Sequence, residues 1–72
     1  MRTADLFAGC GGLSLGFLRA GYRLVAAIDS WEAARRCYEA NLPGHPFFQM
    51  DLSKTEEALE VLRPLAPQVV IG

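Results

Sequence analysis

TADLFAGCGG, residues 3–12, is a short and mostly apolar run that ends in a cluster of glycines. This pattern is typical of a buried β-strand followed by a tight turn. Apolar residues recur with helical spacing from Leu13 to Ala20, and Gly21 stands where a helix commonly takes a left-handed residue. The sequence therefore predicts a strand, a glycine loop and a helix over about residues 12–20.

A second strand and helix are predicted next. The continuous apolar run 24–28 ends at Asp29, as expected of a parallel strand that is covered on both faces. Ser30 is the expected N-cap of a helix over about residues 31–41, because its side-chain oxygen can accept a hydrogen bond from the first turn. Five residues share one face of this helix: Trp31, Ala34, Cys37, Tyr38 and Asn41.

The remaining residues predict one more helix between two short strands. Residues 47–50 predict a weak strand that ends at Asp51. The sequence SKTE, residues 53–56, fits the capping box S-x-x-E and predicts the start of a helix that Pro64 is expected to stop. Residues 69–71 predict a fourth buried strand, so the order of elements is β-α-β-α-β-α-β.

This order predicts an α/β fold of Rossmann-like type, in which helices lie on the faces of a parallel sheet. Residues 1–72 are expected to form part of a single domain, truncated after the fourth strand. Domains below roughly 70–80 residues usually need a disulfide, a metal or an ideal helical core. None is evident here, so a larger fold or a partner is expected.

The composition is 51% hydrophobic and 21% charged, with a net charge of −1. No apolar run is long enough to span a membrane and no signal peptide opens the sequence, so the expected location is the cytoplasm. The charge is too small to attract a nucleic acid by itself.

Cys10 and Cys37 are expected to be reduced, with Cys37 in the core, and their spacing suits no metal. His45 is expected to be a solvated loop residue.

The predicted ends of the strands carry residues that suit a nucleoside. Glycines let a backbone approach a ligand, and the N-terminus of the next helix offers N–H groups to a phosphate or carboxylate. Asp29 follows Gly9 by twenty residues, the spacing at which an acid commonly binds ribose hydroxyls. Asp51 is placed to accept a hydrogen bond from an adenine amine. Apolar surface for the base is expected from Phe7, Trp31 and Leu52.

Simpler interpretations exist for each feature. The glycines alone could form only a tight turn, and Asp29 and Asp51 could be helix caps. Phe7 could belong to the core, and for Trp31 the core is the favoured interpretation. A dinucleotide is disfavoured, because Ser14 stands where G-x-G-x-x-G requires glycine, and no P-loop follows. S-adenosylmethionine, an adenosine ligand with a carboxylate instead of a pyrophosphate, suits the loop better.

Several segments resemble the C5-cytosine-specific DNA methyltransferase family, and the likeness covers the whole chain. DLFAGCGGLSLG, residues 5–16, resembles the first family motif, D-L-F-A-G-x-G-G. Two segments resemble the second motif of the family: AIDSWEAA, residues 27–34, and YEAN, residues 38–41. MDL, residues 50–52, resembles the third family motif. VVIG, residues 69–72, resembles the strand that leads into the catalytic motif. The resemblance implies the cofactor-binding half of one methyltransferase domain.

The resemblance also implies individual roles in S-adenosylmethionine binding. Phe7 would pack against the cofactor, Asp29 would hold the ribose hydroxyls and Asp51 would accept from the adenine amine. Ser30 falls where many members carry a base-stacking side chain, whereas here the aromatic residue is Trp31. The implied cofactor-binding set is Phe7, Ala8, Gly9, Cys10, Gly11, Gly12, Leu13, Asp29, Ser30, Trp31, Asp51 and Leu52.

The activity that the resemblance implies is methyl transfer from S-adenosylmethionine to C5 of cytosine in double-stranded DNA. The family places its catalytic thiolate in a Pro-Cys dipeptide a few residues after the fourth strand, and these residues contain no such dipeptide. No catalytic residue is therefore expected here, and the isolated chain is expected to be inactive. DNA would bind through the missing remainder of the enzyme. The alternative is a non-catalytic nucleoside-binding fragment or split-gene subunit that needs a complementing chain.

Overall fold

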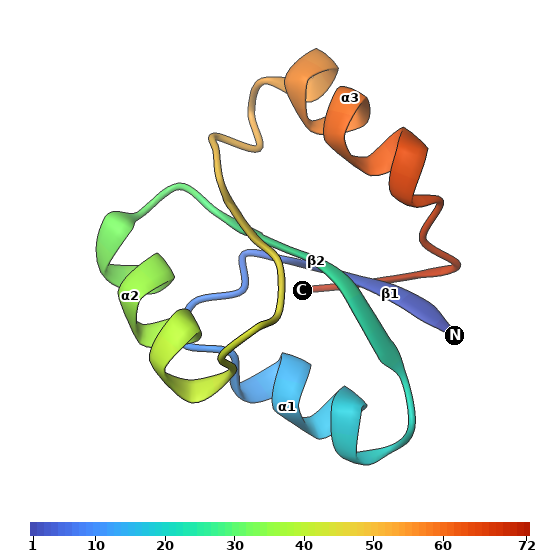
Figure 1. Ribbon diagram of the computed structural model, residues 1–72. Helices are drawn as coiled ribbons and strands as arrows, with labels where there is room; N and C mark the ends of the chain where they lie inside the picture. Colours follow the sequence, from blue (N-terminus) through green and yellow to red (C-terminus); the bar gives the residue numbers. More distant parts are fainter.

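The computed structural model describes residues 1–72 and contains the predicted strands and helices in the predicted order (Figure 1). None of its helices is long and apolar enough to cross a membrane. The elements are β1 (Arg2–Leu6), α1 (Gly12–Arg19), β2 (Arg23–Asp29), α2 (Glu32–Asn41), β3 (Phe47–Gln49), α3 (Thr55–Leu65) and β4 (Val69–Ile71).

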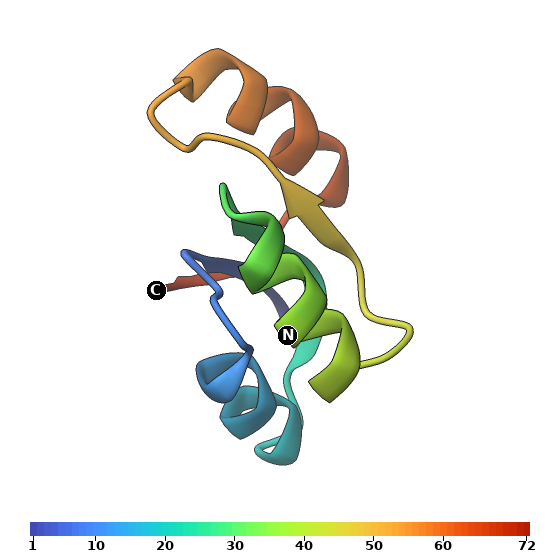
Figure 2. The same cartoon turned by 90° about the vertical axis from the view of Figure 1, so that its left-hand side faces the viewer.

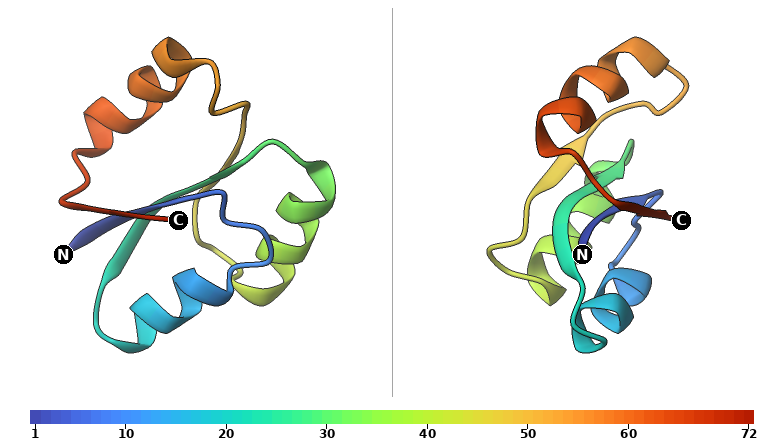
Figure 3. Two further views of the ribbon diagram at one scale, coloured as in Figure 1. Left: turned by 180° about the vertical axis from the view of Figure 1, so that it is seen from behind. Right: turned by 90° about the vertical axis from the view of Figure 1, so that its right-hand side faces the viewer.

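The strands form one parallel sheet with the order β3-β2-β1-β4. α1 and α2 lie on one side of the strands and α3 lies on the other (Figures 1 and 2). Seen from behind, the C-terminal strand β4 runs beside β1 (Figure 3). Because all strands are parallel, their carboxyl ends meet at one edge of the sheet. The predicted Rossmann-like α/β class is confirmed.

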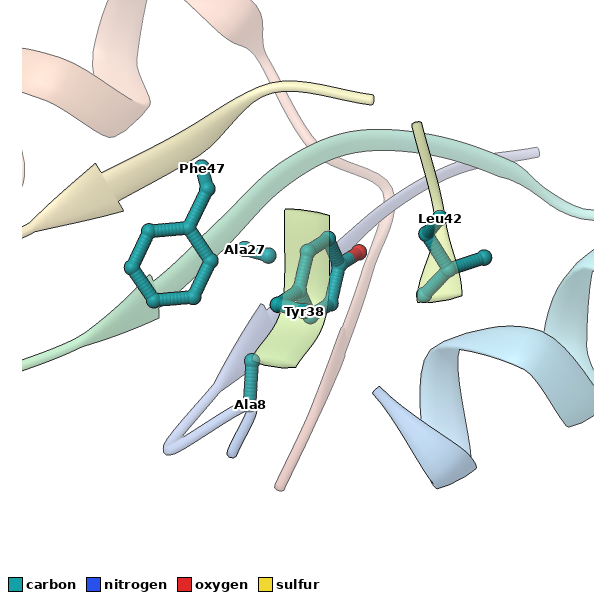
Figure 4. Packing of buried hydrophobic residues seen from close by; sticks show 5 residues of the cluster. All are labelled: Ala8, Ala27, Tyr38, Leu42 and Phe47. Atoms are coloured by element: carbon teal, nitrogen blue, oxygen red, sulfur yellow. The ribbon is translucent and has the colours of Figure 1, made fainter. Parts of the chain in front are cut away.

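The core lies between the sheet and the first two helices. Residues 24–28 of β2 are buried, as expected of a strand covered on both faces. The Tyr38 ring of α2 lies 5.2 Å from the Phe47 ring of β3, measured between centroids. Each large side chain buried in this way contributes roughly 1.5–3 kcal/mol. Figure 4 shows the central cluster, which consists of Ala8, Ala27, Tyr38, Leu42 and Phe47.

The end of α1 confirms the predicted role of Gly21. This glycine has a φ of 91°, and its N–H donates to the carbonyl of Leu18 at 3.0 Å. The N–H of Tyr22 donates to the carbonyl of Phe17 at 3.0 Å, and the two rings meet edge to face with centroids 5.0 Å apart. This is a Schellman motif with its usual hydrophobic contact, which satisfies the last carbonyls of α1 and turns the chain toward β2.

The start of α2 differs from the prediction. Trp31, not Ser30, is the N-cap residue, and no side chain caps the helix. Trp31 has an extended backbone, with φ −97° and ψ 132°, so its side chain does not share the inward face of the helix that follows. It is 70% exposed, and the favoured prediction that it belongs to the core is wrong.

Both predicted ends of α3 also need correction. The predicted capping box is absent: Lys54 is the N-cap, and no side chain caps the helix. Instead, Oδ1 of Asp51 accepts a hydrogen bond from the N–H of Ser53 at 2.9 Å in the turn before the helix. Pro64 lies inside α3, which ends at Leu65. Proline removes one backbone donor, and so close to the end of a helix this affects only the last turn.

Gly16, in the middle of α1, is expected to be a site where alanine stabilises the chain. A Cβ atom at this position meets no other atom within 4 Å. Gly16→Ala should raise the free energy of unfolding by about 0.5–1 kcal/mol, because glycine loses more backbone entropy in a helix than alanine does. Urea unfolding of the variant and the parent chain measures the difference. A lower urea midpoint for Gly16→Ala than for the parent chain would contradict the expectation that the added methyl group fits without a clash.

Candidate functional site

The loop between β1 and α1 turns sharply through three positive φ angles. These are 57° at Phe7, 56° at Gly9 and 90° at Gly11. The N–H of Ala8 donates to the carbonyl of Ile28 at 3.0 Å, which fixes the loop against β2. A left-handed φ costs a non-glycine residue such as Phe7 about 1–2 kcal/mol. The Phe7 side chain is 70% exposed, so the alternative that it belongs to the core is wrong.

Asp29 and the glycine loop lie together, as the sequence predicts. Oδ2 of Asp29 accepts a hydrogen bond from the N–H of Gly9 at 3.0 Å. Oδ1 accepts one from the N–H of Ser30 at 2.7 Å. An ionised carboxylate has about four lone-pair sites, so Asp29 keeps the capacity to accept further hydrogen bonds. Because Asp29 accepts a hydrogen bond from the glycine loop, it is not only a cap of the helix that follows it.

Asp51 lies at the neighbouring strand end. The N–H of Met50 donates to the carbonyl of Asp29 at 3.0 Å, which places the end of β3 beside the end of β2. Asp51 is exposed, and hydrogen bonds from the side chain and backbone of Ser53 hold the pKa of its carboxyl below the usual value. No hydrogen bond joins Asp51 to the glycine loop. Leu52, which follows it, is half-buried.

The predicted residues form an open edge of the sheet and do not enclose a cavity. The largest cavity, about 420 Å³, lies at the start of β2 and is lined by Arg23 and His45 among others. His45 is half-buried, with Nδ1 buried and without a hydrogen-bond partner, so the prediction of a solvated residue is wrong. Gly12 and Leu13 line a groove of about 350 Å³ along α1. No cavity is lined by Asp29.

Cys10 and Cys37 form a disulfide, so the prediction that they are reduced is wrong. Their Cα atoms lie 4.8 Å apart, although 27 positions separate them in sequence. Nδ2 of Asn41 donates to the carbonyl of Cys10 at 2.9 Å and holds α2 against the loop. Cys37 is half-buried. The cellular compartment gives only a general expectation of whether cysteines are paired. The disulfide forms here because the packing of α2 on the loop brings the two cysteines together.

Three buried residues behind the loop form a hydrogen-bond chain that the sequence motifs do not predict. The hydroxyl of Tyr38 donates to Oγ of Ser14 at 3.0 Å, and the hydroxyl of Ser14 donates to Oδ2 of Asp5. Asp5 is 1% exposed, whereas Tyr38 and Ser14 are fully buried. The available signal was the acid itself, which stands between Ala4 and Leu6 in a strand and therefore needs a buried partner.

Asp5 also changes what the N-terminus of α1 can bind. Burial raises the pKa of the Asp5 carboxyl, while hydrogen bonds from the side chain and backbone of Ser14 act in the opposite direction and Asp29 raises it further. Gly11, the N-cap residue, has no side chain to cap the helix. The protein's own carboxyl therefore lies at the helix N-terminus, the predicted position of the anionic group of a ligand.

The site has acidic groups and no basic partner. The ion pairs of the chain join Arg35 to Glu39 and Arg36 to Glu32, all within α2. No basic side chain lies within ion-pair distance of Asp5 or Asp29. An unpaired carboxylate repels other anions, so the edge beside Asp29 disfavours a pyrophosphate and favours a ligand that carries positive charge.

The chain is similar to known DNA methyltransferases. The family model described as C-5 cytosine-specific DNA methylase matches residues 1–65. Type II methyltransferase M.HgiGI of Herpetosiphon aurantiacus is 46% identical over 72 residues, which make up 100% of this chain and 56% of that protein. Type II methyltransferase M.HgiDI of the same organism is 44% identical over 72 residues, again 100% of this chain but 23% of that protein.

A solved structure shares the fold. The crystal structure of a DNMT2 mutant from Spodoptera frugiperda matches with a TM-score of 0.82 at 20% sequence identity, over 96% of this chain and 21% of that chain. This chain therefore spans from under a quarter to about half the length of the relatives described above.

Proposed function

Because the chain belongs to the C-5 cytosine-specific DNA methylase family, we propose that it provides the S-adenosylmethionine-binding part of an enzyme that methylates C5 of cytosine in DNA. The observation that carries this proposal is the hydrogen bond from the N–H of Gly9 to Asp29. It places an acid with free acceptor capacity directly against a loop that a ligand can approach closely. In the proposal, Asp29 accepts hydrogen bonds from the two ribose hydroxyls.

The chemistry of the site supports this cofactor over a dinucleotide. S-adenosylmethionine carries a positive sulfonium, a positive ammonium and one carboxylate, so its net charge is positive, and it supplies the methyl group when bound. The carboxyl of Asp29 has no basic partner within ion-pair distance, and the buried carboxyl of Asp5 accepts hydrogen bonds from Ser14 in the first turn of α1, where dinucleotide folds bind a pyrophosphate. These features favour a cationic nucleoside over an anionic one.

The other predicted residues have proposed roles that follow from their exposure. The exposed ring of Phe7 packs on the cofactor, and the loop backbone surrounds the methionine part. The exposed Trp31 offers an aromatic face for adenine where Ser30 cannot. Asp51 accepts from the adenine amine. The remaining members of the set are loop residues and one apolar contact for the ring: Ala8, Gly9, Cys10, Gly11, Gly12, Leu13 and Leu52.

Recognition of double-stranded DNA and activation of cytosine are proposed to lie outside these residues. The chain contains no Pro-Cys dipeptide, and its two cysteines are joined to each other. A disulfide sulfur is not available to add to C6 of a base, as a thiolate nucleophile must. The isolated chain is therefore proposed to bind the cofactor without transferring its methyl group.

Replacing Asp29 tests the proposal. Asp29→Asn keeps the size of the side chain but removes its charge and one acceptor, so affinity for S-adenosylmethionine should fall by about 1–3 kcal/mol, or roughly fivefold to 150-fold. Isothermal titration calorimetry measures the two dissociation constants. Glu57→Gln removes an exposed acid of α3 and is the matched control, which should bind like the parent chain. Equal affinities for parent and Asp29→Asn would remove Asp29 from the site.

A hybrid protein extends the same experiment from binding to transfer. Residues 1–72 replace the matching segment of Type II methyltransferase M.HgiDI, to which they are 44% identical. The hybrid should transfer methyl groups from S-adenosylmethionine to cytosine in DNA, and Asp29→Asn should raise the KM for the cofactor. A folded hybrid that binds the cofactor but transfers nothing would favour a nucleoside-binding subunit instead.

A further inference from the structure

Tyr38 contacts the glycine loop from behind in two ways. Its hydroxyl donates to Oγ of Ser14 in the first turn of α1. Its ring packs against Gly11, since a Cβ atom added at Gly11 would lie 3.0 Å from Cδ2 of Tyr38. Tyr38 belongs to α2 and is fully buried, so it touches no bound ligand. One side chain thus links α2 to both the end of the loop and the start of the next helix.

We propose that Tyr38 is a positioning residue, which through Ser14 and Asp5 holds the glycine loop in the conformation that binds the cofactor. The inference rests on the proposed function for its effect on affinity, but its effect on the loop is independent of any ligand.

The loop needs such a restraint because its conformation is unfavourable by itself. One of its three positive φ angles falls at Phe7, where a left-handed backbone is unfavourable, whereas glycine adopts the other two readily. Strained backbone of this kind persists only where surrounding contacts fix it. At the front, Asp29 holds the N–H of Gly9. At the back, the chain from Tyr38 to Asp5 holds the first turn of α1, so the loop is fixed at both ends.

The hydrogen-bond chain formed by Tyr38, Ser14 and Asp5 is also sensitive to the loss of one of its side chains. Its three side chains are buried, and a buried polar group that loses its partner has an unfavourable desolvation free energy. Without the Tyr38 hydroxyl, Ser14 loses its donor, and its own hydroxyl is free to rotate away from Asp5. The first turn of α1 and the glycines before it then gain alternative conformations. Cofactor affinity falls because only one of these conformations is competent.

The test uses variants that remove single hydroxyl groups. Tyr38→Phe and Ser14→Ala should each weaken binding of S-adenosylmethionine by roughly tenfold, measured by calorimetry well below the unfolding temperature. The amide resonances of Gly9 and Gly11 in NMR spectra recorded without cofactor should shift or broaden in both variants. Ser14→Thr retains a hydroxyl but adds a buried methyl group, so it should lie closer to the parent chain than Ser14→Ala does in affinity and in the resonances. Tyr22→Phe, which removes a hydroxyl after the opposite end of α1, is the matched control and should change neither quantity.

The outcomes separate the two proposals. If Tyr38→Phe and Ser14→Ala lose thermal stability but match Tyr22→Phe in affinity and in the glycine resonances, the positioning role is overturned. The hydrogen bonds from Tyr38 to Asp5 then contribute only to stability. If the parent chain does not bind S-adenosylmethionine, the proposed function fails, while the glycine resonances still decide whether Tyr38 sets the loop.

Discussion

Reduction of the disulfide between Cys10 and Cys37 is expected to lower the free energy of unfolding by about 3.5 kcal/mol, the chain-entropy value for a closed loop of this length. The two cysteines are 27 positions apart, so the disulfide restricts a large part of the unfolded chain. Urea unfolding with and without dithiothreitol measures the change. A small domain has a marginal net stability, so the reduced chain should unfold at a markedly lower urea concentration.

The control is the double variant Cys10→Ser with Cys37→Ser. It should resemble the reduced chain, and dithiothreitol should not alter it further. A parent chain whose unfolding midpoint is the same in both conditions would show that the disulfide does not contribute to stability.

Gly11→Ala is expected to destabilise the chain by about 3 kcal/mol, the sum of a left-handed backbone cost and an overpacking cost. Gly11 is buried and has a φ of 90°. A methyl group there would overlap Cδ1 of Leu42 and lie 3.0 Å from Cδ2 of Tyr38. Both contacts belong to the core, so neither neighbour can move freely. Chemical unfolding of the purified variant measures the loss.

Gly9→Ala separates the two contributions. Gly9 also has a positive φ, 56°, but a Cβ atom there meets nothing within 4 Å. Its cost should be limited to the backbone, about 1–2 kcal/mol. If Gly11→Ala were no more destabilising than Gly9→Ala, the close packing of the loop on α2 would be contradicted.

The order and type of the elements could be predicted because each depends on local sequence. The apolar run of β2, the helical spacing of α2 and the glycine after α1 each specify their structure within a few neighbouring residues. Helix starts were less predictable. Ser30 and the SKTE segment are both compatible with capping, but the path of the chain from the preceding strand decides which residue becomes the N-cap.

The candidate site could be predicted only where strand order brings its parts together. The contact of Asp29 with Gly9 follows from adjacent parallel strands and was expected. The contacts of Cys10 with Cys37 and of Tyr38 with Ser14 depend on how α2 packs across α1 and the loop. That packing is set by side-chain volumes in three dimensions, which periodicity does not describe. The exposure of Trp31 likewise depends on a single extended residue before the helix.

Trp31 gives the protein an intrinsic optical label. It is the only tryptophan of the chain and lies two positions after the acid that holds the loop, with most of its surface in water. Indole emission shifts to shorter wavelength when water is excluded, so any ligand that covers Trp31 can be followed by fluorescence without attaching a dye. The two tyrosines report on other regions, one in the core and one beyond the far end of α1, which keeps the tryptophan signal specific to this edge.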